Sequence, residues 1–278
     1  MAIDEIRQFR LEKLKKLKEA GMDPYASKAK KDADISDVIL SWDKFESKKD
    51  YTSLVGRVMS SRGQGSLIFV DLNDGTGKIQ TLLKKDEIDE KSFTLFEEAI
   101  DIGDFVEVTG TFFVTKRGEK TLAVKNWKIL TKSLHPLPEK WHGLQDEEQR
   151  YRKRYLDILL DPELKKLIEL KSKFWDSARQ FFKKKGFLEV ETPTLEITTG
   201  GAEARPFKTH HNDFDVDLYL RISIGELWQK RLIAAGIPKT FEIGRAYRNE
   251  GTSQEHVQEF TNLEFYWSYA DYKDGMSL

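Results

Sequence analysis

The chain has 278 residues, and its 46 lysines and arginines nearly balance its 47 aspartates and glutamates. At about 150 residues per domain, this length predicts two domains. The absence of cysteine excludes disulfide scaffolds, thiolate zinc sites and cysteine nucleophiles. The N-terminus is charged where a signal peptide is apolar, and the apolar runs are too short to span a bilayer, so we expect a soluble, cytoplasmic protein without membrane contact.

Residues 1–50 begin with a strongly basic segment. Between Arg7 and Lys18 there are six basic residues and one acidic residue, and leucines recur near helical spacing. Gly21 followed by Pro24 is a typical helix stop. We predict an amphipathic helix over residues 3–20 with a basic outer face, which either is simply solvated or contacts nucleic acid.

Residues 51–132 contain short apolar runs separated by turn signals. Extended segments are predicted at residues 52–60, 66–72, 78–83, 105–114 and 120–130, and a helix is predicted at 91–100. Three strands, a helix and two further strands match the order of a five-stranded OB-fold barrel, which binds nucleic acid across one face.

Three side chains of this segment are candidates for contacting single-stranded RNA. Phe69 supplies a ring on which a base can stack, and Arg62 and Glu119 supply a cation and a hydrogen-bond acceptor. The apolar run 67–70, however, favours Phe69 as a core residue. Both interpretations remain open from the sequence.

A hinge between the domains is predicted over residues 133–160. Residues 133–143 lack periodicity and contain Pro136 and Pro138, which is typical of such a connector. The cation-rich stretch 150–155 follows. It is either a charged helix start or a phosphate-contacting part of the hinge.

Residues 161–278 predict an α+β domain. A helix capped by Asp161 runs to Gly186, and the strand-like runs 240–248 and 260–267 predict an antiparallel hairpin. Strand periodicity places four side chains on one face of the hairpin and apolar residues on the other. The first face combines aromatic rings with a carboxylate, which suits a cleft; its residues are Phe260, Asn262, Glu264 and Tyr266.

Several segments together resemble the class II lysyl-tRNA synthetases. Residues 186–193 resemble motif 1 of that family, and residues 241–251 with 259–261 resemble motif 2. Lysine specificity is indicated by four further stretches: 200–207, 209–212, 142–144 and 152–157. The resemblance implies an α+β architecture in which a five-stranded OB-fold β-barrel that binds the anticodon precedes an incomplete class II antiparallel-sheet catalytic domain. It also implies a homodimer whose interface includes Pro193.

The resemblance assigns roles to the hairpin residues. Arg248 is the expected catalytic residue, because its guanidinium can bridge the lysine carboxylate and the α-phosphate of ATP. Phe260 is expected to stack under adenine, and Glu250 and His256 are expected to contact the nucleotide.

The amino-acid pocket and the anticodon site follow from the same resemblance. Glu226, beside the backbone of Gly201, is expected to bind the α-amino group of L-lysine, and Glu264 and Tyr266 its side-chain ammonium. In the barrel, Arg62, Phe69 and Glu119 match the positions that read anticodon uridines of tRNA(Lys).

The sequence ends soon after the motif 2 strand. We expect motif 3 and the ligands of the catalytic Mg²⁺ to lie beyond Leu278, with no metal site in this chain, so that this chain is a fragment that does not aminoacylate by itself. Two alternatives stay open: a non-catalytic tRNA-binding protein, and a synthetase of the aspartyl or asparaginyl type.

Overall fold

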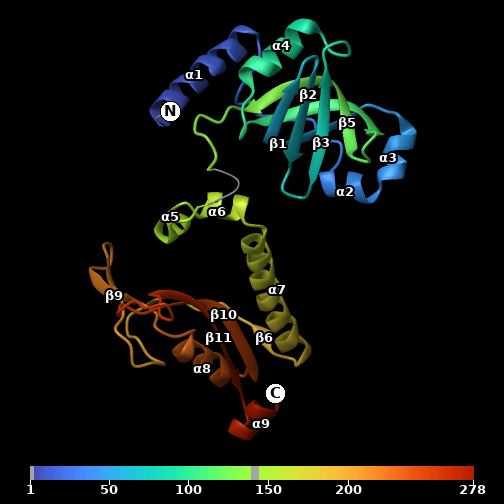
Figure 1. The fold of residues 1–278 in the computed structure, drawn as a ribbon. Coiled ribbons are helices and arrows are strands. Elements are labelled where there is room, and N and C mark those ends of the chain that lie inside the picture. The colour runs from blue at the N-terminus through green and yellow to red at the C-terminus, as the bar shows by residue number, and fades with distance from the viewer. Residues whose placement is uncertain (1–2, 139–143) are drawn as a thin grey trace. The chain divides into compact units, whose positions relative to one another are not determined.

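The computed structural model describes residues 3–138 and 144–278, and the chain forms two compact units, Met1–Leu160 and Asp161–Leu278 (Figure 1). His142 and Gly143 of the expected lysine signature lie outside the described residues. Each unit is described separately below.

The first unit is built around a closed five-stranded barrel with strand order β1-β2-β3-β5-β4 (Figure 1). Neighbouring strands are antiparallel except β3 and β5, which are parallel. A helix separates the third strand from the fourth, so the predicted barrel order is confirmed. The strands are β1 (Thr52–Gln64), β2 (Leu67–Asn73), β3 (Lys78–Lys84), β4 (Phe105–Val114) and β5 (Lys120–Thr131). The helices are α1 (Ile3–Glu19), α2 (Ile35–Leu40), α3 (Trp42–Lys48), α4 (Glu90–Ala99), α5 (Glu147–Arg152) and α6 (Arg154–Leu160).

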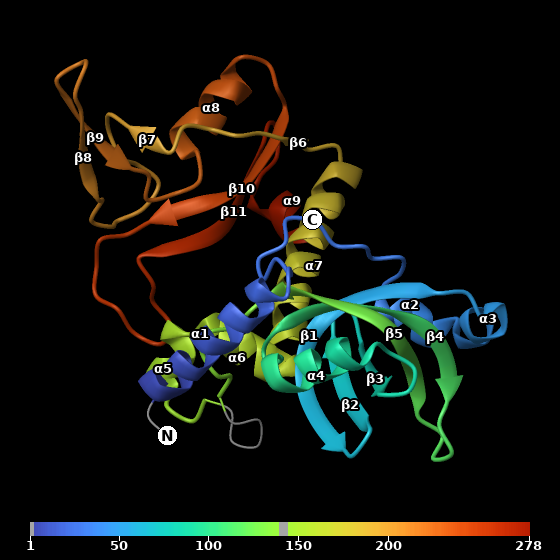
Figure 2. The ribbon, with the colours of Figure 1, turned by 90° about the horizontal axis from the view of Figure 1, so that it is seen from above.

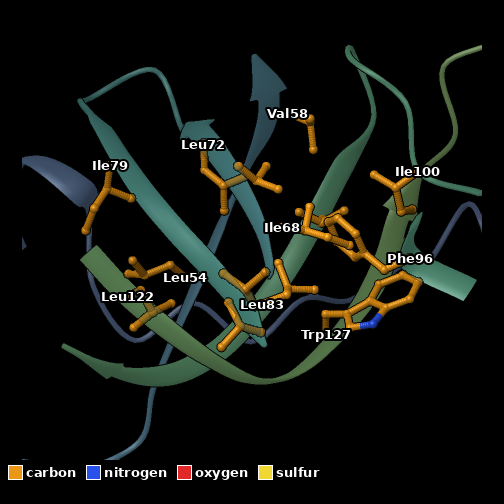
Figure 3. Packing of buried hydrophobic residues seen from close by; sticks show 14 of the residues in the cluster. Leu54, Val58, Ile68, Leu72, Ile79, Leu83, Phe96, Ile100, Leu122 and Trp127 are labelled. Carbon is orange, nitrogen blue, oxygen red and sulfur yellow. The ribbon is translucent and has the colours of Figure 1, made fainter. Parts of the chain in front are cut away.

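The barrel interior is filled by alternate residues of each strand together with apolar residues of α4. Ile68 and Leu72 of β2 point inward (Figure 3), and Phe96 of α4 contacts Trp127 edge-on, with ring centroids 4.9 Å apart. Since strand side chains alternate between faces, Phe69 lies on the outer face of β2 and is only half-buried. The core interpretation of Phe69 is therefore wrong.

Helix α1 is fixed to the barrel by a charged residue that was expected to face solvent. Arg10 is 7% exposed and donates hydrogen bonds to the carbonyl oxygens of Ile102 (3.0 Å), Ser133 (2.9 Å) and His135 (3.1 Å). Lys13 also turns inward and pairs with Asp101 at 2.6 Å. The predicted helix is confirmed, but the prediction that its cations form an outer face is wrong for Arg10, because a guanidinium can satisfy several carbonyl groups at once.

The second unit contains two small sheets, ordered β11-β10-β6 and β7-β9-β8 (Figure 2). Strands β10 and β11 form the predicted hairpin and pair over nine residues each. The strands are β6 (Leu188–Glu189), β7 (Leu195–Glu196), β8 (Lys208–His211), β9 (Val216–Leu220), β10 (Lys239–Tyr247) and β11 (Glu259–Trp267). The helices are α7 (Pro162–Lys184), α8 (Glu226–Ala234) and α9 (Tyr272–Ser277).

An aromatic cluster holds α7 against the hairpin. Phe182 stacks on Phe241 with centroids 5.1 Å apart, and Phe187 and Phe265 complete the cluster. Leu263, Phe265 and Trp267 pack here, which confirms the predicted apolar face of β11. The opposite face of the hairpin is consequently free to carry polar chemistry.

Candidate catalytic and RNA-binding sites

The polar face of the β10–β11 hairpin brings two carboxylates directly opposite each other. The strand register pairs Glu242 with Glu264, and two residues further along it pairs Thr240 with Tyr266. Like charges opposite each other on a sheet destabilise it unless each charge is compensated. How each carboxylate is compensated therefore defines the chemistry of this face.

Glu242 is neutralised within the protein by a buried ion pair. Its Oε1 atom lies 2.6 Å from Nη1 of Arg221, both side chains are 4% exposed, and its Oε2 atom accepts a 2.6 Å hydrogen bond from the Thr192 hydroxyl. Arg221 also donates to the carbonyl oxygen of Arg245 (2.8 Å). Gly244 leaves room for it, since a Cβ atom there would lie 2.3 Å from Nη2 of Arg221. This network thus links β10, the segment after β9 and the segment after β6.

Glu264 has no such counter-charge. Its Oε1 atom accepts hydrogen bonds from the backbone N–H of Ile224 (3.0 Å) and from the Asn262 amide (3.2 Å). Within the described parts of the chain, no lysine, arginine or histidine forms an ion pair with it. Neutral donors orient this carboxylate while leaving its charge available to a cationic ligand.

Tyr266 lies next to this carboxylate on the same strand face. Burial, followed by the negative charges of Glu226 and Glu264, raises the pKa of the Tyr266 phenol from 10.0 to about 12. The phenol therefore stays neutral near pH 7. A neutral phenol can still donate or accept a hydrogen bond on this face of the hairpin.

Glu226 begins α8 and lies against a glycine loop. A Cβ atom on Gly201 would lie 2.0 Å from Oε2 of Glu226 and 2.2 Å from Oγ of Ser223, and Gly201 has a φ of +89°. Only glycine fits this position without displacing the carboxylate. Lys230, one turn further along α8, pairs with Oε1 of Glu226 at 2.6 Å.

A cavity of about 290 Å³ lies at the end of the hairpin, where the loop between β10 and β11 begins. The structure brings Arg248, Glu250, His256 and Phe260 together in its lining. The Arg248 guanidinium lies 5.2 Å from the centroid of the Phe260 ring, and its Nε donates to the carbonyl oxygen of Ile222 (3.4 Å). All four residues expected to contact the nucleotide thus share one cavity.

Two of these loop residues are positioned by nearby groups. Glu250 accepts a hydrogen bond from the backbone N–H of Arg205 (3.1 Å), and the His256 ring lies 2.8 Å from the Ser253 hydroxyl. Pro193, the expected interface residue, is exposed within the chain.

In the barrel unit, a cavity of about 790 Å³ contains all three residues expected to contact RNA. Arg62 and Phe69 face each other in the β1–β2 register, and Glu119 borders the same space from the β4–β5 turn. Asp71 also lines this cavity. Burial alone would raise the pKa of the Asp71 carboxyl, but hydrogen bonds from Ser60 (2.6 Å) and Lys78 (2.9 Å) outweigh this effect. The pKa of Asp71 therefore lies below its usual value. Asp71 therefore stays ionised but is compensated.

The most important residues that the sequence did not single out are Arg221, Glu242 and Thr192. A glutamate between Phe241 and Ile243, in the middle of an apolar strand, is the one signal that could have drawn attention to a buried ion pair. Its partner lies 21 residues away, and no local pattern indicates that pairing.

Comparison with known proteins agrees with this architecture. Residues 146–278 match the family described as tRNA synthetases class II (D, K and N), and residues 52–130 match the OB-fold nucleic acid binding domain. The two units thus match the two kinds of domain expected for a class II aminoacyl-tRNA synthetase with an OB-fold domain. No helix within residues 3–138 or 144–278 combines the length and the apolar character that crossing a bilayer requires.

Comparison with individual proteins indicates which synthetases of this class the chain resembles. The chain is 46% identical to the lysine–tRNA ligase of Pelotomaculum thermopropionicum and 46% identical to that of Carboxydothermus hydrogenoformans, over 99% of its own length in both cases. It is 45% identical to the lysine–tRNA ligase of Halalkalibacterium halodurans over its whole length. Over almost its whole length the chain is thus similar to class II lysine–tRNA ligases. It spans 54–56% of the length of these three relatives.

Proposed function

We propose that this protein activates L-lysine with ATP and transfers the lysyl group to tRNA(Lys) during translation in the cytoplasm. The main observation in support of the proposal is that the charges of the two opposed carboxylates are compensated differently. Glu242 is neutralised by Arg221, whereas Glu264 is oriented by neutral donors and keeps its charge. A pocket of this kind favours an ammonium group and disfavours a neutral or acidic side chain.

Lysine would be bound at both of its amino groups. In this proposal the ε-ammonium lies between Glu264 and the Tyr266 phenol, and the α-amino group binds Glu226 beside the backbone of Gly201. Lys230 already contacts Glu226, but it is largely exposed, so that the α-ammonium group can compete for the carboxylate at little cost.

Arg248 would bring the two reacting anions together. Its planar guanidinium can bind the lysine carboxylate and the α-phosphate at the same time, which lowers their repulsion and stabilises charge that develops during attack on the phosphorus. Phe260, on which Arg248 lies, offers the face for adenine, with Glu250 and His256 at the rim of the same cavity.

Magnesium accompanies ATP in enzymes of this kind, but the described residues do not fit it. Within residues 3–138 and 144–278 no group of three or more histidine, aspartate or glutamate side chains is arranged to hold a metal ion. No step of the proposal passes through this ion. The residues named above bind and orient the substrates.

A homodimer is proposed on the basis of α7. Four apolar side chains spaced along one side of this helix are 39–63% exposed: Leu167, Leu170, Phe174 and Phe181. An apolar stripe of this kind usually marks a protein–protein contact. Pro193 would belong to the same interface.

Amino-acid selectivity tests the central proposal. Calorimetry with a non-hydrolysable ATP analogue is expected to show heat on addition of lysine and none for aspartate or asparagine. Glu264→Gln should abolish the lysine signal, whereas Glu259→Gln, which removes the same charge from an exposed position on β11, should preserve it. Binding of aspartate or asparagine in preference to lysine would refute the proposal. RNA binding without any lysine binding would favour the non-catalytic alternative.

A further inference from the structure

The barrel cavity contains more cationic charge than base recognition requires. Four basic side chains line it, and one of them, Lys78, is paired with Asp71. The other three are Arg62, Lys116 and Arg117, and none of them forms an ion pair with a residue that the structure describes. Glu119 is the only uncompensated acid among the lining residues, so the cavity has a surplus of positive charge.

Two of the three free cations lie next to each other on one ordered turn. The turn between β4 and β5 is closed by hydrogen bonds from the Thr115 N–H to the Glu119 carbonyl oxygen (3.0 Å) and from the Gly118 N–H to the Thr115 carbonyl oxygen (2.9 Å). The Thr115 hydroxyl accepts a third, from the Glu119 N–H (3.0 Å). Lys116 and Arg117 are therefore exposed side chains on a fixed backbone at the edge of the cavity.

From this arrangement we propose that Lys116 and Arg117 form a binding site for the phosphate groups of single-stranded RNA, separate from the base-contacting residues Arg62, Phe69 and Glu119. A base stacked on Phe69 carries its flanking phosphates toward the rim of the cavity, where the turn places two cations. Such contacts increase affinity for every sequence and leave the choice of base to the residues inside the cavity. The proposal rests on the proposed binding of the anticodon by the barrel.

The salt dependence of RNA binding measures these contacts. Each phosphate contact to a single strand contributes about 0.7 to the slope of log Kd against log salt concentration. Replacing both residues, as Lys116→Gln/Arg117→Gln, should therefore reduce the slope by about 1.4. At about 0.1 M salt this corresponds to a loss of about 25-fold in affinity, provided that the non-electrostatic part is unchanged.

The experiment uses the whole chain and two short hairpin RNAs, one with three uridines in its loop and one with three cytidines. Fluorescence anisotropy over a range of KCl concentrations gives Kd and slope for each RNA. The double variant should weaken binding of both RNAs by the same factor and keep their affinity ratio. Lys44→Gln/Lys48→Gln is the matched control, because it removes two exposed cations of α3 that do not line the cavity; it should leave the slope unchanged.

Each possible result bears on one proposal. An unchanged slope in Lys116→Gln/Arg117→Gln, or an equal change in the control, would overturn the phosphate site. A changed ratio between the two RNAs in the double variant would also overturn it, since the turn would then read bases. If the unmodified chain shows no preference for the uridine loop, the proposed anticodon function fails irrespective of the slope.

Discussion

Replacing Arg221 by methionine should destabilise the second unit strongly, because it removes one partner of the buried ion pair with Glu242. Arg221→Met keeps most of the side-chain volume but leaves the Glu242 carboxylate 4% exposed without a counter-charge and directly opposite Glu264. In the unmodified protein, burial raises the pKa of Glu196, and the positive charge of Arg221 opposes this increase. The substitution therefore affects several carboxylates at once.

The expected loss can be worked from these contacts. Removing one partner of a buried ion pair costs about 3–5 kcal/mol, because the remaining charge is buried and uncompensated. The double variant Arg221→Met/Glu242→Leu removes both charges of this pair, and the remaining cost comes from the carbonyl groups of Thr192 and Arg245, which lose their donor. Glu196 loses the nearby positive charge equally in both variants. We expect the cost at the carbonyl groups to be about 1–3 kcal/mol, so the double variant should be more stable than the single one.

Native-state hydrogen exchange is the suitable assay, because the two units of the chain need not unfold together. The amides of β10 should exchange faster in Arg221→Met by a factor equivalent to about 3–5 kcal/mol, and amides of the barrel strand β2 provide an internal control that should not change. Unchanged exchange in β10 would refute the reasoning. Exchange in the double variant as fast as in the single variant would show that the unpaired carboxylate is not the cause.

Three further predictions follow from individual contacts. Gly201→Ala should force Glu226 away from its place and lower lysine affinity at least about 10-fold in calorimetry, since hydrogen bonds to charged groups contribute about 1.5–3 kcal/mol; unchanged affinity would remove Glu226 from the pocket. The side chain of Asp74 is 2% exposed. Although burial opposes ionisation of this carboxyl, hydrogen bonds from the Thr76 hydroxyl and three backbone N–H groups lower its pKa from 3.8 to about 2. Because the folded-state pKa is depressed, its stabilisation of about 2 kcal/mol is present above pH 4 and is lost as the pH falls toward 2; acid unfolding of Asp74→Asn should lack this component. The Tyr266 phenol should show no titration up to pH 11 when followed by tyrosine ring-carbon NMR, and Glu264→Gln should lower its pKa.

The barrel was predictable because its signals are local. Turn residues divide residues 52–130 into runs of strand length, and the predicted runs coincide with β1 to β5 within a few residues at most ends. Phe69 shows the limit of this reasoning, because the run Leu67 to Val70 is apolar throughout and does not show which residues face inward. Pairing of β2 with β1 and β3 decides it: Ile68 and Val70 fill the interior, and Phe69 faces outward beside Arg62.

The hairpin illustrates the same limit for charges. Period two correctly predicts that Glu264 and Tyr266 share a face, and resemblance to a family assigns them to a ligand. The sequence does not show that Glu242 lies opposite Glu264, since this depends on the register between β10 and β11. The role of Arg221 as the partner of Glu242 depends on the packing of three segments that are distant in the sequence.

The barrel cavity and the polar face of the hairpin follow one electrostatic arrangement, and its sign differs between them. In the barrel, Lys78 and Ser60 compensate Asp71, and the charges that remain are mainly cationic. On the hairpin, Arg221 compensates Glu242, and the charge of Glu264 remains. A charge already paired within the protein gains little from a ligand, whereas an oriented but unpaired charge gains a full interaction. The remaining charges therefore indicate the ligands: phosphate groups at the barrel and an ammonium group at the hairpin.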